Sequence, residues 1–481
     1  MDSVFRSATA RAVFSLCLPL FAIVLAGCAA VGPDHVRPEI PLRETWHSRL
    51  GSGLSNHEAD ARSMAAWWAT LNDPKLSQLM DYAVSGNLDL KKARARVREA
   101  RARRRIAEAA LFPSVTGSAS ASWSDTYKGV GPDTTGELYT AGFDAGWELD
   151  IFGGVRRSVE AAQRDLEARE EGLRNVLVTL LAEVALNYLD VRTYQERLSV
   201  AEGNLDSQSE TYRLTQWRYE AGLSDELAVQ QALYNLENTR SQIPVLRTGL
   251  EAAMNRVAIL LGEQPGALHG ELEQREPITV PPLQVAVGVP ADLVRRRPDV
   301  RQAEKELAAQ TARVGVATAE LYPKFTLNGS IGLESLSLSN LSSGTLSVVG
   351  GPAVTWSIFK GGATRQNIEV QSALQEQALI EYETTLMEAL EEVENALIAY
   401  AEVQERRQSL SVATEAAQAA ARLAQQKYEA GLTDFTDVLV AQRSVLSLQE
   451  QLVLSNWNVA GNLVRLYKAL GGGWTLPANE G

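Results

Sequence analysis

Few residues in this chain have the types and spacing that enzyme or metal chemistry needs. The sequence contains no GxSxG, GxxxxGKS/T or HExxH motif, which would indicate a hydrolase, a phosphate-binding loop or a zinc protease. Four scattered histidines and two cysteines, Cys17 and Cys28, do not have the spacing of a zinc site or a redox pair. We therefore expect no catalytic residue, no metal and no cofactor.

The charge balance excludes a further class of function. The 481 residues include 46 basic and 59 acidic side chains, which gives a formal net charge of −13. Nucleic-acid-binding proteins normally carry a basic surface that matches the phosphate backbone. A nucleic acid is therefore not expected as a partner, although 45% apolar and 22% charged residues are typical of a folded protein.

One cysteine has a chemical role that its neighbours specify. Two arginines precede an apolar run that is short for a membrane span, and the run ends at the tetrapeptide Leu25–Cys28. This pattern is typical of bacterial lipoproteins, in which cleavage precedes the cysteine and the cysteine is lipidated. We expect a signal peptide over 1–27 and a lipid on Cys28. By resemblance to sorted bacterial lipoproteins, Ala29 rather than Asp at the next position favours the outer membrane. The alternative is an ordinary signal peptide with a chance cysteine.

The rest of the chain is a tandem duplication. The octapeptide Arg218–Asp225 recurs 209 residues later as Lys427–Asp434. A row of apolar residues at every seventh position, Val229 to Val257, recurs with the same offset as Val438 to Leu466. Chance agreement over such a span is improbable, so we expect two structurally equivalent halves.

Each half predicts a helix, two strands, a very long helix and another helix. Richness in Ala, Leu, Glu, Arg and Gln supports the helices, although Pro244 is predicted to kink the helix that contains it. The seven-residue repeats predict coiled-coil packing. At 1.5 Å per residue, a long helix of roughly 69 residues measures about 100 Å, so two shorter helices can stack end to end beside it. The expected helices cover about 74–110, 153–221, 223–261, 291–321, 361–430 and 432–470.

The strands alternate in a way that suits a membrane. From Leu138 to Ile151 apolar side chains alternate with polar ones, and the polar side includes Asp144, Glu148 and Asp150. A soluble sheet with one buried face is the alternative, but strands of about ten residues also match a bilayer crossing. Four strands cannot close a barrel, and open edges are forbidden in lipid, so two, three or four copies must assemble. The expected strands cover about 112–123, 138–151, 324–334 and 346–358.

Several co-linear motifs place these features in a known family. They are Cys28–Asp34, Trp67-Trp68, Asp73-Pro74, Asn87–Leu90, Arg296–Arg301 and both Tyr-Glu-Ala-Gly-Leu turns. With the duplication, they make the chain resemble the TolC/OprM outer-membrane factor superfamily, specifically its NodT-type lipoproteins. The resemblance implies a mostly helical fold with a membrane β-barrel contribution. It further implies a homotrimer, in which four strands per chain form a twelve-stranded barrel above a long periplasmic helical barrel.

The same resemblance implies a passive export duct in the Gram-negative outer membrane, anchored in lipid and extending into the periplasm. Its partners would be a periplasmic adaptor and an inner-membrane transporter, which together form a tripartite efflux system and open the duct at its periplasmic tip. One alternative is the outer-membrane duct of a type I protein secretion system. Another is a periplasmic coiled-coil adaptor lipoprotein, but adaptors carry lipoyl-like domains around one hairpin, whereas this chain has two hairpins.

The resemblance also assigns candidate sites at the tips. The turns Gly222-Leu223-Ser224 and Gly431-Leu432-Thr433 correspond to the tips at which family members meet the adaptor. Glycine there also has a plain structural reason, because it permits the left-handed turn between antiparallel helices.

Family members constrict the tip with aspartate rings and neighbouring arginines. The candidate gate residues are therefore Asp434, Asp437, Val440 and Arg443. Asp437 matches one acidic position and Arg443 matches the arginine, whereas Val440 stands at the next acidic position. We hypothesise a gate with one carboxylate ring at Asp437, whose like charges repel, and an apolar ring near Val440. The alternative for Asp437 is a solvated helix residue. Asp144, Glu148 and Asp150 are the expected residues of the barrel lumen.

The expected layout follows from these assignments. A signal peptide (1–27) precedes a lipidated N-terminal and equatorial segment (28–73), a first repeat (74–262), an inter-repeat linker (263–290), a second repeat (291–471) and a C-terminal tail (472–481).

Overall fold

The computed structural model describes residues 30–48, 53–55, 64–126, 134–276, 285–288 and 295–474. The predicted signal peptide, Cys28 and the last seven residues lie outside the described residues. The chain divides into two units, each assembled from both halves of the duplication. The first unit comprises 1–39, 96–170 and 302–383, and the second comprises 40–95, 171–301 and 384–481.

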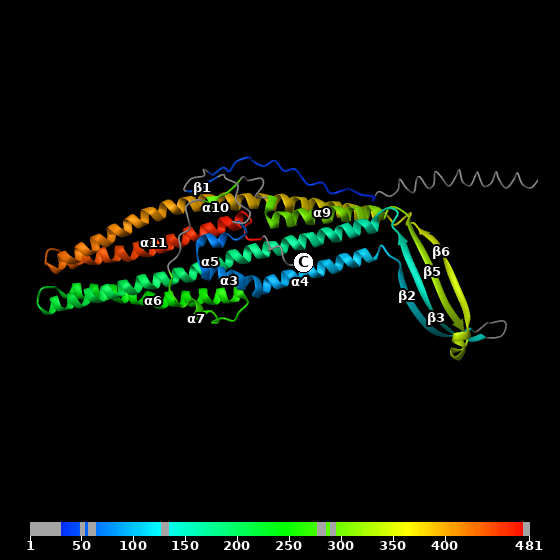
Figure 1. The fold of residues 1–481 in the computed structure, drawn as a ribbon, viewed down its shortest axis with the longest axis horizontal. Helices are drawn as coiled ribbons and strands as arrows, with labels where there is room; N and C mark the ends of the chain where they lie inside the picture. The colour runs from blue at the N-terminus through cyan, green and yellow to red at the C-terminus, as the bar shows by residue number, and fades with distance from the viewer. Residues whose placement is uncertain are drawn as a thin grey trace, which may run out of the picture. The chain divides into compact units, whose positions relative to one another are not determined.

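The first unit contains a four-stranded antiparallel sheet (Figure 1). Its order is β2-β3-β5-β6, so the central β3–β5 pair joins the two halves of the duplication. The four predicted strands are confirmed, although β3 ends at Leu149 and leaves Asp150 in the following turn. The 3-10 helix η2 (Leu338–Ser343) connects the second pair. The strands are β2 (Ser114–Thr126), β3 (Thr134–Leu149), β5 (Lys324–Ser335) and β6 (Thr345–Thr355).

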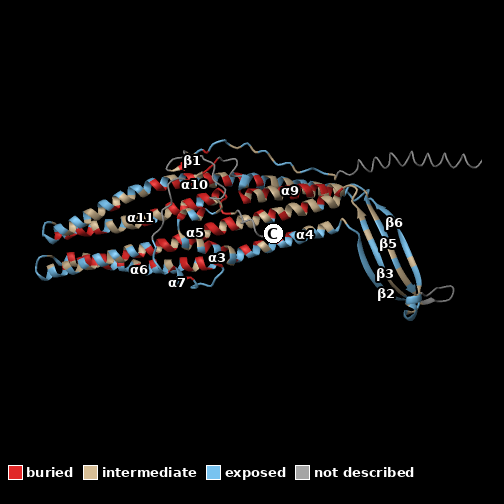
Figure 2. Cartoon of the chain, viewed as in Figure 1, coloured by how far each residue is buried: buried red, intermediate tan, exposed pale blue. Residues whose placement is uncertain are grey.

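One face of this sheet is apolar and exposed. The cross-strand register sets Phe143 opposite Ile331, and Ile331 opposite Val348, so the apolar positions of adjacent strands lie on one side. Phe143 is 62% exposed and Val348 is 68% exposed. Figure 2 shows exposed and intermediate residues throughout the described strands. This apolar face also includes Val115, Ala119, Trp123, Tyr139, Trp147, Leu149, Phe325, Leu327, Leu333, Leu346 and Val354.

The duplication extends to individual hydrogen bonds at the end of the sheet. Trp147 Nε1 donates to the carbonyl of Leu111 at 2.9 Å. Its equivalent in the second half, Trp356, donates to the carbonyl of Leu321 at 3.1 Å. The two indoles therefore fasten equivalent helix–strand connections with the same contact.

The helices of the first unit follow the order of the strands to which they connect. They belong to α4 (Leu88–Ala109), α5 (Gly154–Glu220), α9 (Pro298–Ala319) and α10 (Ala363–Glu429). Arg101 of α4 pairs with Glu170 of α5. Asp165 of α5 pairs with Arg313 of α9, and Gln310 of α9 donates to Gln371 of α10. These contacts give the lateral order α4-α5-α9-α10.

The predicted helix over 74–110 is wrong at one point, because it consists of two helices, α3 (Pro74–Gly86) and α4. Asn87 interrupts them and starts α4 by accepting the Leu90 amide at 2.8 Å. The Asn87 side chain also donates to the carbonyl of Leu260 at 2.8 Å. A Cβ on Gly86 would lie 2.0 Å from the Leu261 carbonyl oxygen, so only glycine permits this close approach.

The second unit contains the main apolar core. The core gathers α3, α6 (Glu226–Leu261), α11 (Phe435–Ala469) and the nearby parts of α5 and α10. Trp67 of the 3-10 helix η1 (Trp67–Leu71) is 1% exposed and stacks on Tyr467, with ring centroids 5.6 Å apart. The short helix α7 (His269–Leu272) and a two-residue parallel pair, β1 (Leu54–Ser55) with β4 (Val285–Ala286), complete the unit. The predicted helices over 153–221, 223–261, 361–430 and 432–470 are thus confirmed. The predicted helix over 291–321 is wrong at its start, because α9 begins at Pro298, a residue that favours the first position of a helix, and Arg297 just before it is not helical.

Within the described ranges, no helix combines the length and the apolar character that a bilayer crossing requires.

Candidate functional site

Both predicted tip turns have the same hydrogen-bond geometry. At the end of α5, the Gly222 amide donates to Tyr219 O at 2.9 Å and the Leu223 amide donates to Arg218 O at 2.7 Å. This is the Schellman motif, which requires a left-handed residue at the position of Gly222, whose φ is 70°. Gly431 has a φ of 72° and repeats both bonds at the end of α10. Conformation therefore requires these glycines, since a Cβ on Gly222 would meet nothing within 4 Å.

The two tip hairpins are fastened to each other in the second unit. A small buried cluster joins Ala228 and Ala232 of α6 to Tyr428 of α10 and to the start of α11. The guanidinium of Arg218 lies 4.7 Å from the centroid of the Tyr428 ring. Leu432 nevertheless remains 77% exposed at the outermost turn. The buried cluster thus holds the two hairpins together below the turns. The turns themselves expose the apolar side chains of Leu223 and Leu432, each followed by a hydroxyl residue, Ser224 or Thr433.

The predicted gate residues lie near one another on α11 but do not form one cluster. Asp437 accepts a hydrogen bond from the Thr433 hydroxyl, which holds its carboxylate at the turn. Val440, one turn later, is 57% exposed. Arg443 instead reaches α6, where its Nε donates to Asn235 at 3.3 Å. Among the residues that the structure describes, no ion pair joins Asp437 to Arg443.

The two aspartates that begin the tip helices have different roles. Asp225 caps α6, since its Oδ1 accepts the Ala228 amide at 2.8 Å. Its equivalent in the second half, Asp434, occupies the same position at α11 without a side-chain capping bond. The exposed carboxylate of Asp434 therefore adds negative charge at the second tip.

The three predicted lumen residues lie in different surroundings. Asp144 is on the polar face of the sheet and accepts from the Ser118 hydroxyl at 3.2 Å. Glu148 lies on the same face, four residues along β3. Asp150 lies beyond the strand and caps α5, accepting the amides of Val155 at 3.0 Å and Arg156 at 2.9 Å. Asp150 therefore has a structural role that strand alternation did not reveal.

A buried arginine that the sequence analysis missed holds the segment after Cys28. Arg157 is 5% exposed, and its Nε donates to Val31 O at 3.1 Å while its Nη2 contacts Asp34 at 2.7 Å. The Val31 amide also donates to Phe152 O at 3.0 Å. These contacts lie in the first unit, and they hold the segment Val31–Asp34 against the start of α5.

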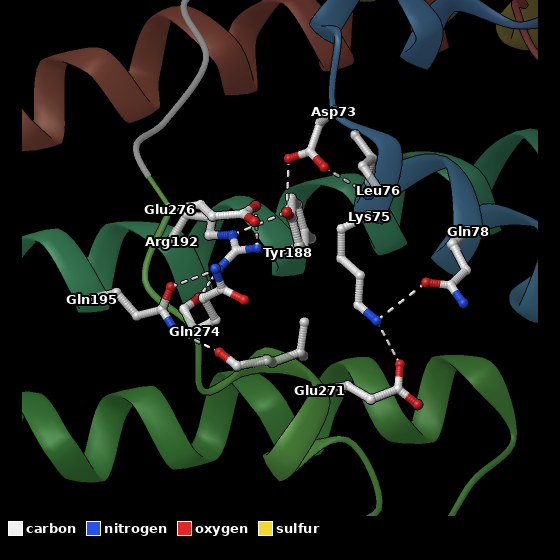
Figure 3. Close-up of polar contacts among 11 residues, drawn as sticks. Asp73, Lys75, Leu76, Gln78, Tyr188, Arg192, Gln195, Glu271, Gln274 and Glu276 are labelled. Atoms are coloured by element: carbon white, nitrogen blue, oxygen red, sulfur yellow. Dashed lines mark hydrogen bonds and ion pairs between the residues drawn. The ribbon is translucent and has the colours of Figure 1, made fainter.

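A second buried arginine, Arg192 of α5, anchors the inter-repeat segment (Figure 3). Its side chain is 4% exposed and contacts Gln274 O at 2.6 Å and the Glu276 carboxylate at 2.9 Å. Its Nε donates to the Tyr188 hydroxyl at 2.9 Å, and that hydroxyl donates to Asp73 at 2.7 Å. Burial, together with the bond to Asp73, raises the pKa of Tyr188, so its hydroxyl keeps the proton that it donates.

The described residues contain no group of three or more His, Cys, Asp or Glu side chains that could hold a metal ion. The buried charges have structural partners, as Arg157 and Arg192 show.

Sequence comparison identifies the family. The model of the family described as "Outer membrane efflux protein" matches residues 79–263 and 289–472, two segments that start 210 residues apart and end 209 residues apart. Nodulation protein T of Rhizobium leguminosarum bv. viciae is 32% identical over 96% of this chain and 94% of its own length. The toluene efflux pump outer membrane protein TtgI of Pseudomonas putida is 31% identical over 96% of this chain and 99% of its own length.

Structural comparison gives the same answer. The solved structure of the outer-membrane channel OprN has a TM-score of 0.86 and 36% sequence identity, and the match covers 93% of this chain and 100% of that one. The resemblance to NodT-type lipoproteins is thereby confirmed. This chain belongs to the outer membrane efflux protein family: it is the outer-membrane channel of an efflux system and not an enzyme.

Proposed function

We propose that three copies of the chain pool their sheets into one twelve-stranded barrel, which serves as a passive exit duct. The observation that carries this proposal is the exposed apolar face of the sheet, where Phe143, Ile331 and Val348 lie on adjacent strands. Such a face is costly in water and suits lipid, whereas the two outer strands need partners from other copies. The opposite face, with Asp144 and Glu148, then lines the water-filled lumen.

The contacts of the N-terminal segment support a lipid anchor beside this sheet. Residues 31–34 are held by Arg157, at the start of the helix that follows β3. Cys28 precedes Val31 by three residues in the sequence, so acyl chains on it can enter the outer membrane. Each buried methylene of those chains contributes about 0.8 kcal/mol to anchoring.

The tips provide the docking surface for a periplasmic adaptor, which links the duct to an inner-membrane transporter. Exposed Leu223 and Leu432 offer apolar contacts, and the Schellman turns hold them on a rigid base. The transporter supplies the energy and selects the cargo.

Asp437 supplies the gate, and its position on α11 supports this assignment. Three Asp437 carboxylates brought together around an axis repel each other, so a closed state needs cations or cationic partners. Val440, exposed one turn later, adds an apolar ring. Arg443 holds the helix to Asn235 and Tyr234 of α6, which keeps α11 in place.

Planar-bilayer conductance tests the gate. Asp437→Ala combined with Arg443→Ala is expected to raise single-channel conductance, because the change removes the carboxylate ring and the contact that positions its helix. The matched control is Glu237→Ala with Arg240→Ala, which removes an exposed pair on α6. Conductance equal to that of wild type in the gate variant would count against the gate.

The duct itself is tested by the unmodified protein. The full-length chain, extracted from outer-membrane fractions, is expected to migrate as a heat-modifiable trimer and to conduct ions in a planar bilayer. A non-conducting single subunit would overturn the proposed function.

A further inference from the structure

Two helices form the edges of the helical layer in the first unit. The lateral order α4-α5-α9-α10 leaves α4 and α10 on the outside, just as the order β2-β3-β5-β6 leaves β2 and β6 at the edges of the sheet. Helix α4 leads into β2, and α10 follows β6. One edge of the first unit therefore carries α4 and the unpaired side of β2, and the other edge carries α10 and the unpaired side of β6.

The outer helix α4 carries a basic row. Arg98 and Arg105 are exposed and lie seven residues apart, and Lys91 extends the row by another seven residues. In the described part of the chain none of the three makes an ion pair. The remaining arginines toward the end of α4 are engaged, since Arg101, Arg103 and Arg104 pair with Glu170, Glu99 and Glu108. Exposed small residues, Ala95, Ala102 and Ala109, repeat beside the basic row with the same spacing.

The outer helix α10 carries an acidic row with the same repeat. Glu369, Glu376 and Glu383 are exposed and seven residues apart. They too lack ion pairs within the described ranges. A seam of small and apolar residues flanked by one row of charge is the arrangement by which coiled coils choose partners. Such an exposed seam runs beside the acidic row, and it includes Val370, Ala373, Leu374 and Ile380.

The two rows lie at matching distances from the helix ends that connect to the sheet. Arg105 is four residues before the last residue of α4, Ala109, whereas Glu369 is six residues after the first residue of α10, Ala363. The offset of two residues corresponds to about 3 Å along a helix. Because both rows step by seven residues, Arg98 matches Glu376 with the same offset.

The directions of the helices also agree. Helix α4 runs toward the sheet and α10 runs away from it, so α4 of one copy and α10 of the next are antiparallel. At about 100° per residue, the basic row and the acidic row then lie on the same side of their respective seams and face each other.

We propose that α4 of one copy packs on α10 of the next copy, and that the basic row of one meets the acidic row of the other. The exposed surface of each outer helix is therefore covered by a second copy of this chain. Such a head-to-tail contact uses two different surfaces and repeats until a ring closes. This inference rests on the proposed assembly of several copies around one duct.

We call this contact between the basic row of one copy and the acidic row of the next the charge ladder. Charge reversal tests the ladder in the full-length protein, extracted in mild detergent. Arg98→Glu with Arg105→Glu, and separately Glu369→Arg with Glu376→Arg, should each weaken assembly about tenfold, which is about 1.4 kcal/mol. The variant with all four changes restores complementary charges and should assemble within about threefold of wild type. Native mass spectrometry over a dilution series measures the fraction assembled.

A matched control separates the ladder from general charge effects. Arg96→Glu with Arg103→Glu makes the same charge change, also at a seven-residue spacing on α4, but on a different side of the helix. This control should assemble as wild type does. In 1 M salt, where the screening length is about 3 Å, the reversed variants should lose most of their defect relative to wild type.

Three results would overturn the ladder: reversed variants that assemble normally, a four-residue variant as weak as its parents, or a control that is equally weak. The proposed function is judged separately by conductance. A conducting trimer that ignores the charge swaps overturns the ladder alone. Charge-dependent assembly without conductance retains the interface and overturns the duct.

Discussion

Arg192, the buried arginine of α5 that anchors the inter-repeat segment, gives the sharpest prediction on stability. Arg192→Met keeps an apolar stem of similar length but removes the guanidinium that holds residues 274–276. Only two of its contacts hold that segment, since the bonds to Tyr188 and Gln195 stay within α5. The charged bond to Gln274 O is worth about 1.5 kcal/mol, and the pair with Glu276, which is 45% exposed, contributes less than about 1 kcal/mol. We expect local anchoring to weaken by about 2 kcal/mol in total.

Trypsin cleavage after Arg275 measures this loss. When opening is fast relative to cleavage, the cleavage rate follows the population of the open segment. A loss of about 2 kcal/mol therefore predicts cleavage roughly thirtyfold faster in Arg192→Met. The control, Glu202→Gln, removes the partly exposed carboxylate that pairs with Arg275 and should change the rate by less than about fivefold. Equal rates in the two variants would refute the anchoring role of Arg192.

Two further predictions concern the tip and the N-terminal segment. Gly222→Ala should cost about 1 kcal/mol because its φ is 70°, whereas Gly203→Ala, inside α5 and also in open space, should be neutral or stabilising in thermal unfolding; equal effects would contradict the conformational argument. Burial opposes the ionisation of Glu394, but hydrogen bonds from Ser48 and from the backbone of His47 hold its pKa below the ordinary 4.5. The stabilisation from these hydrogen bonds to the Glu394 carboxylate is therefore fully present above pH 4.5 and is lost as pH falls through the lower folded-state pKa. Hydrogen exchange of residues 44–48, corrected for intrinsic rates, should rise in acid for wild type and show no such pH dependence in Glu394→Gln.

Much of the fold could be predicted because local and global signals agree along most of the chain. The long helices combine helix-forming composition with a seven-residue repeat, and α5 and α10 end within a residue or two of the predicted limits. The alternation of β3 predicted a two-faced sheet, and the register across β3, β5 and β6 confirms it. Each of these features depends on side-chain period, which the sequence displays directly.

The features that escaped prediction depend on contacts between distant residues. The pair Gly86-Asn87 is a local signal for the break, since glycine often ends a helix and asparagine often starts one, but the prediction of one helix over 74–110 did not use it. The approach of Gly86 to Leu261, far along the chain, is visible only in the structure. The grip of Arg157 on Val31 also joins distant segments. Periodicity contains no information on such pairs, so only the structure reveals them.

The surroundings of the candidate gate residues were only partly predictable for a similar reason. The spacing of Asp437, Val440 and Arg443 places them on successive turns of one helix, and the structure agrees. The partner of Arg443, however, is α6, because the tip hairpins pack on each other through Tyr428 and Phe435. Sequence spacing alone could not distinguish a partner on the same helix from one across the hairpins.

The stoichiometry of the conducting particle tests the central claim most directly, because a four-stranded sheet with an exposed apolar face needs sister copies to close a pore. Native mass spectrometry of the detergent-extracted protein, followed by bilayer recording on the same sample, joins the two properties. The account predicts a mass of three chains and a conducting channel. A conducting single chain, or a single chain that never conducts, would contradict it.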